Sequence, residues 1–232
     1  METIDSVFKA IDGLSTDSWG RMENVLADTH DLIESIGADA RLLGNLIEHS
    51  RQSDTARKHF ERHRLLDKIH LYESPSGVRL RLHLSTQEHR DRPHDHRFSF
   101  VSTILAGGYL QTRHKLVGDL SGVAPAYQND SDAPRVNVAV VPLFQTFQAV
   151  GSTYSLHHSE IHTTFTQPQS VSLFLRGPAE KDRSIITERE SGTAWWRYGR
   201  EAEPTERRTK VQMSEEYLCG LVANLTAIGV VK

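Results

Sequence analysis

The chain has 232 residues, of which 38% are hydrophobic and 25% charged, and its formal net charge at pH 7 is −3. This length and balance predict a folded protein with one main core, and the scattered basic residues give no argument for a nucleic acid or a membrane as its partner. The single cysteine, Cys219, excludes a disulfide within the chain, and the sequence shows neither a signal-peptide pattern nor an apolar run of membrane-spanning length, so we expect a cytoplasmic protein.

Residues 1–66 have the apolar spacing of helices. Apolar side chains recur there seven and four positions apart, as at Val25, Leu32 and Ile36. Asp39 precedes a run of good helix formers and fits the N-cap of a helix. We predict three or four helices in this segment, which would cover a sheet edge or contribute a dimer contact.

Residues 67–190 consist of short β-rich runs separated by turn residues, which is typical of strands. In the run Val78–Ser85 the apolar side chains share one face, and Arg79, Arg81 and His83 share the other. Further strands are expected at residues 98–105, 109–114, 136–141, 144–150 and 170–176. Many short strands at this spacing predict a β-sandwich or a barrel.

Two segments of different composition complete the chain. Residues 118–135 are rich in Gly, Ser, Asp, Asn and Pro, and we expect a long loop there, either a lid over a site or a disordered segment. Residues 191–232 begin as a charged connection and end in an apolar run that Ser214 opens, which predicts a capped C-terminal helix.

The tripeptide His94-Asp95-His96 is the strongest indication of function in the chain. In an extended segment, residues two apart project from the same face, so the two imidazoles would lie side by side while Asp95 points away. Neutral imidazoles suit iron, copper, zinc or nickel, and a third ligand from another strand would leave positions open for other molecules. The pair is therefore a candidate for half of a metal site.

Two motifs together resemble those of the cupin superfamily. The first is His94-Asp95-His96 followed by the turn Gly107-Gly108, and the second is Tyr154-Ser155-Leu156, a polar turn, and Glu160-Ile161-His162. The second stretch is similar to that of cysteine-dioxygenase-like cupins. The resemblance covers roughly residues 67–180. It implies a mainly β fold, a cupin double-stranded β-helix (jelly-roll barrel), flanked here by the N-terminal helices and the C-terminal helix.

The resemblance also implies a metal site made of three histidines. Many cupins place a glutamate ligand a few residues after the histidine pair, but Phe100 and Val101 occupy those positions here. We expect His94, His96 and His162 to hold the metal, with Fe(II) as the first choice and Zn, Mn, Ni or Cu as alternatives. The third ligand is the open point. If the strand of the second motif begins earlier, at Tyr154, then His157 or His158 would be the ligand instead of His162.

Basic residues of the neighbouring strands are candidates for binding a substrate. Arg176 ends its strand and could clamp a carboxylate with two parallel hydrogen bonds, and Arg81 or His83 could do the same from the adjoining strand. Phe98 and Phe100 would share the face of His96 and make part of the site apolar, which shields bound oxygen and reduced metal from water.

A competing motif is His89-Arg90-Asp91, which with His162 and Arg176 imitates the facial triad and acid-binding arginine of another oxygenase class. Its arginine-rich setting next to Pro93 suggests a connection before a strand, and it leaves the histidine pair at 94 and 96 unexplained.

The resemblance implies a mononuclear non-haem iron oxygenase, an oxidoreductase that acts with dioxygen on a small polar metabolite able to chelate the metal. The substrate would be amino-acid-like, a thiol or an N-hydroxylated compound. Two alternatives remain: a metal-dependent isomerase or lyase that uses no oxygen, and a sensor or binding module without catalysis. A homodimer is expected by resemblance only.

Overall fold

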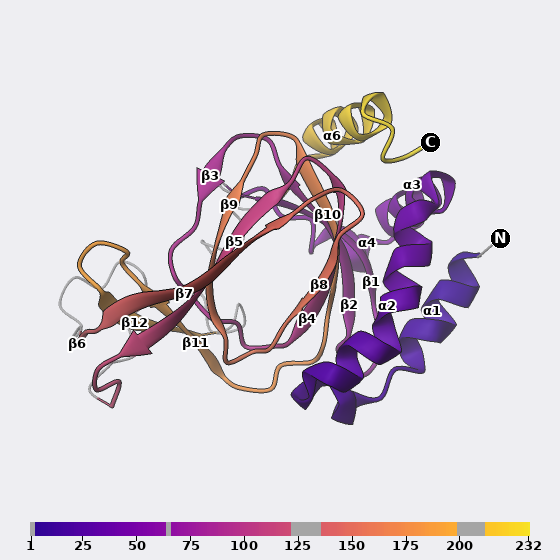
Figure 1. Ribbon diagram of the computed structural model, residues 1–232. Helices are drawn as coiled ribbons and strands as arrows, with labels where there is room; N and C mark the ends of the chain where they lie inside the picture. The colour runs from indigo at the N-terminus through magenta and orange to yellow at the C-terminus, as the bar shows by residue number, and fades with distance from the viewer. Residues whose placement is uncertain (1–2, 64–65, 122–135, 199–211) are drawn as a thin grey trace.

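The computed structural model describes residues 3–63, 66–121, 136–198 and 212–232, and Figure 1 shows a barrel of strands with helices packed against one side. None of the helices in these ranges is long and apolar enough to cross a membrane.

Most of the strands belong to two antiparallel sheets that face each other. The first sheet has the order β1 (Asp67–Glu73), β2 (Arg79–Ser85), β10 (Ser170–Arg176), β4 (Phe100–Ala106) and β8 (Thr153–Leu156). The second has the order β3 (His89–Arg90), β9 (Ile161–Thr166), β5 (Tyr109–Val117) and β7 (Ala139–Gln148). A small third sheet of β11 (Arg183–Thr187), β12 (Thr193–Tyr198) and β6 (Val136–Asn137) lies at one end of the barrel (Figure 1).

The connectivity of the two large sheets is that of a jelly roll. From β2 to β10, leaving out β6 of the third sheet, the chain crosses from one of these sheets to the other at each step except that from β5 to its neighbour β7. This interleaving of strands is the double-sheet jelly-roll arrangement, which cupins share. The chain therefore has the expected fold class: mainly β and cupin-like, with N-terminal helices and a C-terminal helix.

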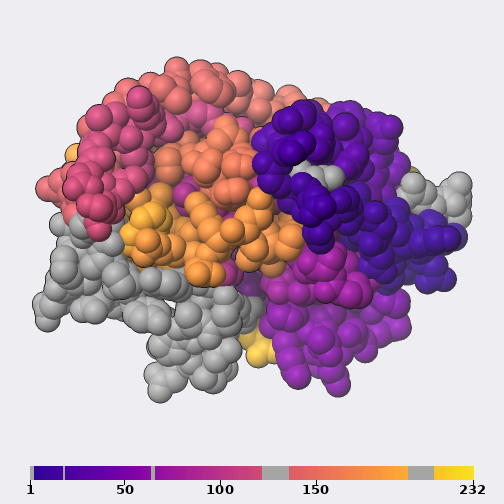
Figure 2. All heavy atoms as spheres, turned by 90° about the horizontal axis from the view of Figure 1, so that it is seen from below, coloured from indigo at the N-terminus to yellow at the C-terminus, as the bar shows by residue number. Residues whose placement is uncertain are grey.

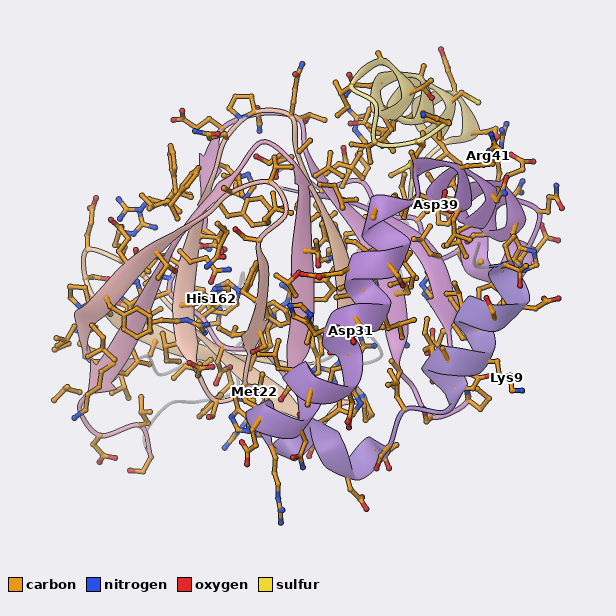
Figure 3. The ribbon with its side chains drawn as sticks, turned by 45° about the vertical axis from the view of Figure 1, so that its right-hand side comes forward. Lys9, Met22, Asp31, Asp39, Arg41 and His162 are labelled. Atoms are coloured by element: carbon orange, nitrogen blue, oxygen red, sulfur yellow. The ribbon has the colours of Figure 1, made fainter. Side chains whose placement is uncertain are left out.

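The helices are α1 (Ile4–Asp12), η1 (Thr16–Gly20), α2 (Met22–Ala38), α3 (Ala40–Arg51), α4 (Asp54–Arg57) and α6 (Glu215–Ala227). The carboxylate of Asp39 accepts hydrogen bonds from the N–H groups of Arg41 and Leu42, so the expected N-cap of α3 is confirmed (Figure 3). Ser214 caps α6 in the same way by accepting from Tyr217 N–H, again as expected.

The alternation of β2 determines where the main core lies. Leu80 and Leu82 are fully buried in the cluster that joins the first sheet to the helices. The opposite face of β2, which carries Arg81 and His83, turns toward the inside of the barrel, because His83 stacks on the inward-facing Phe174. The basic face of this strand thus lines the barrel, while its apolar face binds the helices.

Three details differ from the sequence expectations or extend them. The break expected between strands at 136–141 and 144–150 is wrong: β7 runs through Pro142 from Ala139 to Gln148, and only Val136–Asn137 form a separate strand, β6. Among the described strands β7 pairs only with β5, and an edge strand tolerates a proline. The strand expected from residue 98 begins at Phe100. Most of the expected loop at 118–135 lies outside the described residues.

The third sheet bears on the expected division of the chain at residues 66/67 and 190/191. β11 lies before the boundary at 190/191 and β12 lies after it, yet the two strands pair with each other. The boundaries stay predictions, although the barrel and the C-terminal segment share this small sheet.

Candidate metal centre

The backbone of His94 lies directly beside that of His162 at the start of β9. Each residue donates its N–H to the carbonyl of the other, at 3.0 and 2.9 Å. Residues paired in this way across antiparallel strands carry their side chains on the same face. The pairing therefore brings the second motif of the sequence against the first.

The three expected metal ligands converge. His94, His96 and His162 each offer one ring nitrogen, and these three atoms lie within 4.8 Å of one another; the Nε2 atoms of His96 and His162 are 2.9 Å apart. His162 points into the space that the strands enclose (Figure 3). Two imidazole nitrogens bound at right angles to one metal ion at about 2.1 Å would be about 3 Å apart. The spacing of His96 and His162 therefore fits a shared ion.

The neighbours of His94 fix how its ring is presented. Its Nδ1 lies 2.8 Å from the carbonyl oxygen of Arg92, and because a carbonyl can only accept, Nδ1 carries the proton. This leaves the Nε2 lone pair for a metal, the arrangement in which an outer hydrogen bond orients a ligating histidine. Asp95 points away from the cluster, as expected, and accepts hydrogen bonds from Lys181 Nζ at 2.5 Å and from Ile185 N–H at 2.8 Å.

Burial keeps the inner two imidazoles neutral. It lowers the pKa of His96 and of His162 well below the usual value, and the nearby His94 lowers both pKa values further. A neutral imidazole is the form that binds a metal. The donor set is therefore chemically suited to a divalent transition metal.

Aromatic rings surround the triad on the side of the first sheet. The ring of His96 lies 5.4 Å from that of Phe98 and 5.1 Å from that of Phe100, so both residues share its face as the sequence predicts. Phe100 in turn contacts Phe174 at 4.5 Å, and Phe174 stacks on His83 at 4.2 Å. A continuous series of ring contacts thus links His96 to His83.

The remaining substrate-binding candidates lie on the same inner face. The guanidinium of Arg176 sits 4.4 Å from the centre of the Phe98 ring and donates to the carbonyl of Gly177 at 3.0 Å. Arg176 is 6% exposed, and burial followed by the charges of Arg79 and Arg81 lowers its pKa. Arg81, 8% exposed, lies opposite Phe174 in the β2–β10 register. Arg176 is therefore separated from His96 by a single aromatic ring.

Arg113 is a site residue that the sequence reasoning missed. It lies opposite His162 in the β5–β9 register, donates to the carbonyl of Ser155 at 3.0 Å, and pairs with Glu160 at 3.2 Å. Nothing in the local sequence marks it, because its closeness to the triad depends on the pairing of β5 with β9. It also borders an open pocket of about 440 Å³ whose apolar lining includes Phe144 and Trp196.

The histidines that competed for the third position lie elsewhere. His157 and His158 belong to the β8–β9 turn and form a separate cluster with Glu180. Of the competing motif, His89 contacts the hydroxyl of Thr166, and the carboxylate of Asp91 accepts from Thr164 N–H. Within the described residues neither of them joins the group of His162.

No protein-family model matches the chain, and no curated protein matches its sequence. Solved structures resemble part of it. A cupin superfamily protein from Desulfitobacterium hafniense is 11% identical over 50% of this chain and 81% of that one, with a TM-score of 0.33. Ectoine synthase from P. lautus is 11% identical over 57% and 75%, with a TM-score of 0.36. The hydroquinone 1,2-dioxygenase PnpCD is 10% identical over 58% and 72%, with a TM-score of 0.35.

These similarities are too low to carry an argument about activity, and the two enzymes among these proteins are named for different reactions. The cupin-like assignment of the fold rests on the strand order described above. The chain is thus a jelly roll in which three histidines from two strand-like segments could hold a metal ion.

Proposed function

We propose that the protein is a mononuclear non-haem iron oxygenase of the three-histidine cupin type, acting on a small, anionic metabolite that chelates the metal. The observation that carries the proposal is the convergence of His94, His96 and His162, with His96 and His162 Nε2 2.9 Å apart and no carboxylate in the group. When bound, Fe(II) would supply the redox chemistry with dioxygen that no side chain supplies.

The charge of the donor set favours an anionic ligand. Three neutral imidazoles leave the full positive charge of a divalent ion in the barrel, whereas a glutamate ligand would cancel part of it. Asp95, the nearest carboxylate in the sequence, is turned away and held by Lys181 and Ile185. A carboxylate, thiolate or deprotonated amine of the substrate would therefore be attracted to this centre.

Arg176 is the residue that we expect to bind the far end of the substrate. It is a buried guanidinium whose contacts within the described residues are a backbone carbonyl and the Phe98 ring, with no carboxylate partner. The carboxylate of Glu73 acts on Arg176 from nearby but is already paired with Arg79, and a carboxylate of the substrate would neutralise the buried guanidinium through parallel hydrogen bonds. Arg81 on the same face would add positive charge to this end of the site.

His83 would contribute a hydrogen bond rather than a charge. Burial lowers its pKa well below the usual value, and its buried Nε2 has no hydrogen-bond partner among the residues that the structure describes. A neutral imidazole can donate or accept there, so His83 would orient a polar group of the substrate. Phe98, Phe100 and Phe174 would exclude water between these polar groups and the triad.

The test begins with the metal. The protein is purified without added metal, loaded anaerobically with Fe(II), desalted and analysed for elemental metal, with the His96→Ala variant beside it. We expect one iron per chain in the wild type that His96→Ala loses, whereas His30→Ala, a change of an exposed helical histidine, keeps it. Loaded protein is then screened for oxygen uptake with small amino acids, thiols and N-hydroxylated compounds.

Each alternative predicts a different result. A metal-dependent isomerase or lyase would convert its substrate without oxygen uptake, and a sensor would bind a ligand without turnover. Normal iron retention in His96→Ala would contradict the site itself.

A further inference from the structure

A second group of potential metal ligands lies outside the triad. His157, His158 and Glu180 each offer one ligand atom, and these three atoms lie within 4.8 Å of one another. The two histidines occupy the turn between β8 and β9, and Glu180 belongs to the segment that follows β10. Figure 2 shows orange segments, which include this part of the chain, at the surface of the molecule.

The carboxylate of Glu180 is held in place by a buried serine. Ser99 is fully buried and donates both its backbone N–H, at 3.1 Å, and its hydroxyl, at 2.7 Å, to Glu180 Oε1. Glu180 Oε2 faces His158 Nδ1 at 3.1 Å. One oxygen of the carboxylate is therefore occupied by the protein, and the other is directed at the histidine.

The turn that carries the histidines is also fixed. The backbone N–H of His158 donates to Ser99 Oγ at 3.2 Å, and His157 N–H donates to Glu160 Oε2 at 2.8 Å. His157 Nδ1 lies 2.7 Å from the hydroxyl of Ser159 and accepts from Ser159 N–H at 3.3 Å, so a metal would bind Nε2 with the proton moved to Nδ1, where the Ser159 hydroxyl can accept it. The two imidazole rings are 4.0 Å apart. The donors are thus arranged before any ligand binds.

We infer that His157, His158 and Glu180 form a second metal site, which takes a borderline divalent cation of the Zn²⁺ class independently of the triad. Two imidazoles and a carboxylate are a common donor set for zinc, and a fourth position would be open to water. The side chains of His158 and Glu180 are 22% and 17% exposed, so an ion can reach them while their carboxylate and imidazole stay largely sheltered.

Binding there would connect two parts of the barrel. The ion would tie the β8–β9 turn to the segment after β10, and the same turn leads directly into β9 and His162. This role does not depend on the proposed oxygenase activity, because the second site shares no ligand with the triad.

The experiment is equilibrium dialysis of the full-length protein against Zn²⁺, with elemental analysis of the bound metal. We expect two zinc ions per chain in the wild type, one in His96→Ala, one in His158→Ala, and none in the double variant. When Glu180→Gln is added to His96→Ala, the affinity for the remaining zinc ion should fall by about tenfold or more. His30→Ala serves as the matched control, because His30 pairs with a carboxylate, Glu34, at an exposed position.

The zinc contents of these variants distinguish the second site from the triad. An unchanged zinc content in His158→Ala and in Glu180→Gln would overturn the second site. If His96→Ala binds no zinc, the second site is overturned as well, but the assignment of the first site to the triad is not. Circular dichroism of each variant establishes that it is folded, and Glu180→Gln, which preserves size, replaces His158→Ala if that variant does not fold.

Discussion

His94 and His162 exchange both backbone hydrogen bonds, at 3.0 and 2.9 Å, although they belong to motifs on opposite halves of the barrel sequence. The exchange places their rings 4.6 Å apart. His96 joins the pair because it lies two residues beyond His94 in an extended segment. The candidate centre therefore depends on the two-residue spacing of His94 and His96 and on the backbone pairing of His94 with His162.

The pairing predicts which histidine completes the metal site. His162→Ala should lose most of the bound iron, because a two-histidine remnant holds a metal weakly, whereas His157→Ala and His158→Ala should keep it. Elemental analysis after anaerobic Fe(II) loading measures this, and the three variants remove the same number of atoms. A larger loss in His157→Ala than in His162→Ala would contradict the assignment.

The position of Arg176 predicts a defect in substrate binding without loss of metal. Once a substrate is identified, Arg176→Met should raise its KM by about ten- to a hundredfold, which corresponds to the loss of hydrogen bonds to a charged group. Arg176→Lys should recover part of this effect, since it keeps the charge but not the paired donors.

Arg79→Met is the control for this effect. Arg79 lies beside Arg176 in the β2–β10 register but pairs with Glu73 at 2.7 Å. If Arg79→Met and Arg176→Met raise KM equally, Arg176 has no specific role in binding the substrate.

A buried histidine predicts how stability depends on pH. His70 is 4% exposed, and burial followed by the charge of Arg81 lowers its pKa to about 3. Below pH 6.5, the usual pKa of histidine, His70 binds a proton in the unfolded chain but stays neutral in the folded chain. The free energy of unfolding therefore falls as the pH decreases to about 3.

The slope of that dependence can be measured by urea denaturation at pH 7.5 and pH 5. We expect the wild type to lose on the order of 1–2 kcal/mol of unfolding free energy between these values from His70 alone, and His70→Gln to lose less. An unchanged slope in His70→Gln would show that other groups account for the acid sensitivity.

The outer edge of β7 predicts a surface for the expected homodimer. The strand carries no charged residue and pairs only with β5 among the described strands, and Leu143, Phe144 and Phe147 are each more than half exposed. Figure 2 shows this segment in salmon along one margin of the molecule. An uncharged edge can pair antiparallel with its own copy without opposing like charges, which suits a two-fold interface.

Phe147→Lys should therefore convert a dimer to a monomer in sedimentation experiments at micromolar concentration. Leu26→Lys changes a hydrophobic residue of comparable size and of 36% exposure on α2, and it should leave the assembly intact. A wild-type protein that sediments as a monomer at all concentrations would contradict the dimer.

Local chemistry was sufficient for several features that the sequence predicted. Asp39 caps α3 because its carboxylate reaches N–H groups two and three residues away. Strand β10 is found at the expected residues, since its apolar run has a clear start and end. His94 and His96 share a face, and Asp95 does not, because an extended backbone alternates its side chains.

Features that depend on pairing between distant segments were decided by the tertiary structure alone. The sequence favoured His162 as the third ligand but left His157 and His158 open, and the register of β9 against His94 decides for His162. Arg113 lies beside His162 through the β5–β9 register, which no local pattern encodes. The alternation of β2 predicted two faces, but only packing of the leucines against the helices turned Arg81 and His83 into the barrel. Spacing along the chain fixes which side chains share a face, whereas the burial of apolar surface fixes what that face meets.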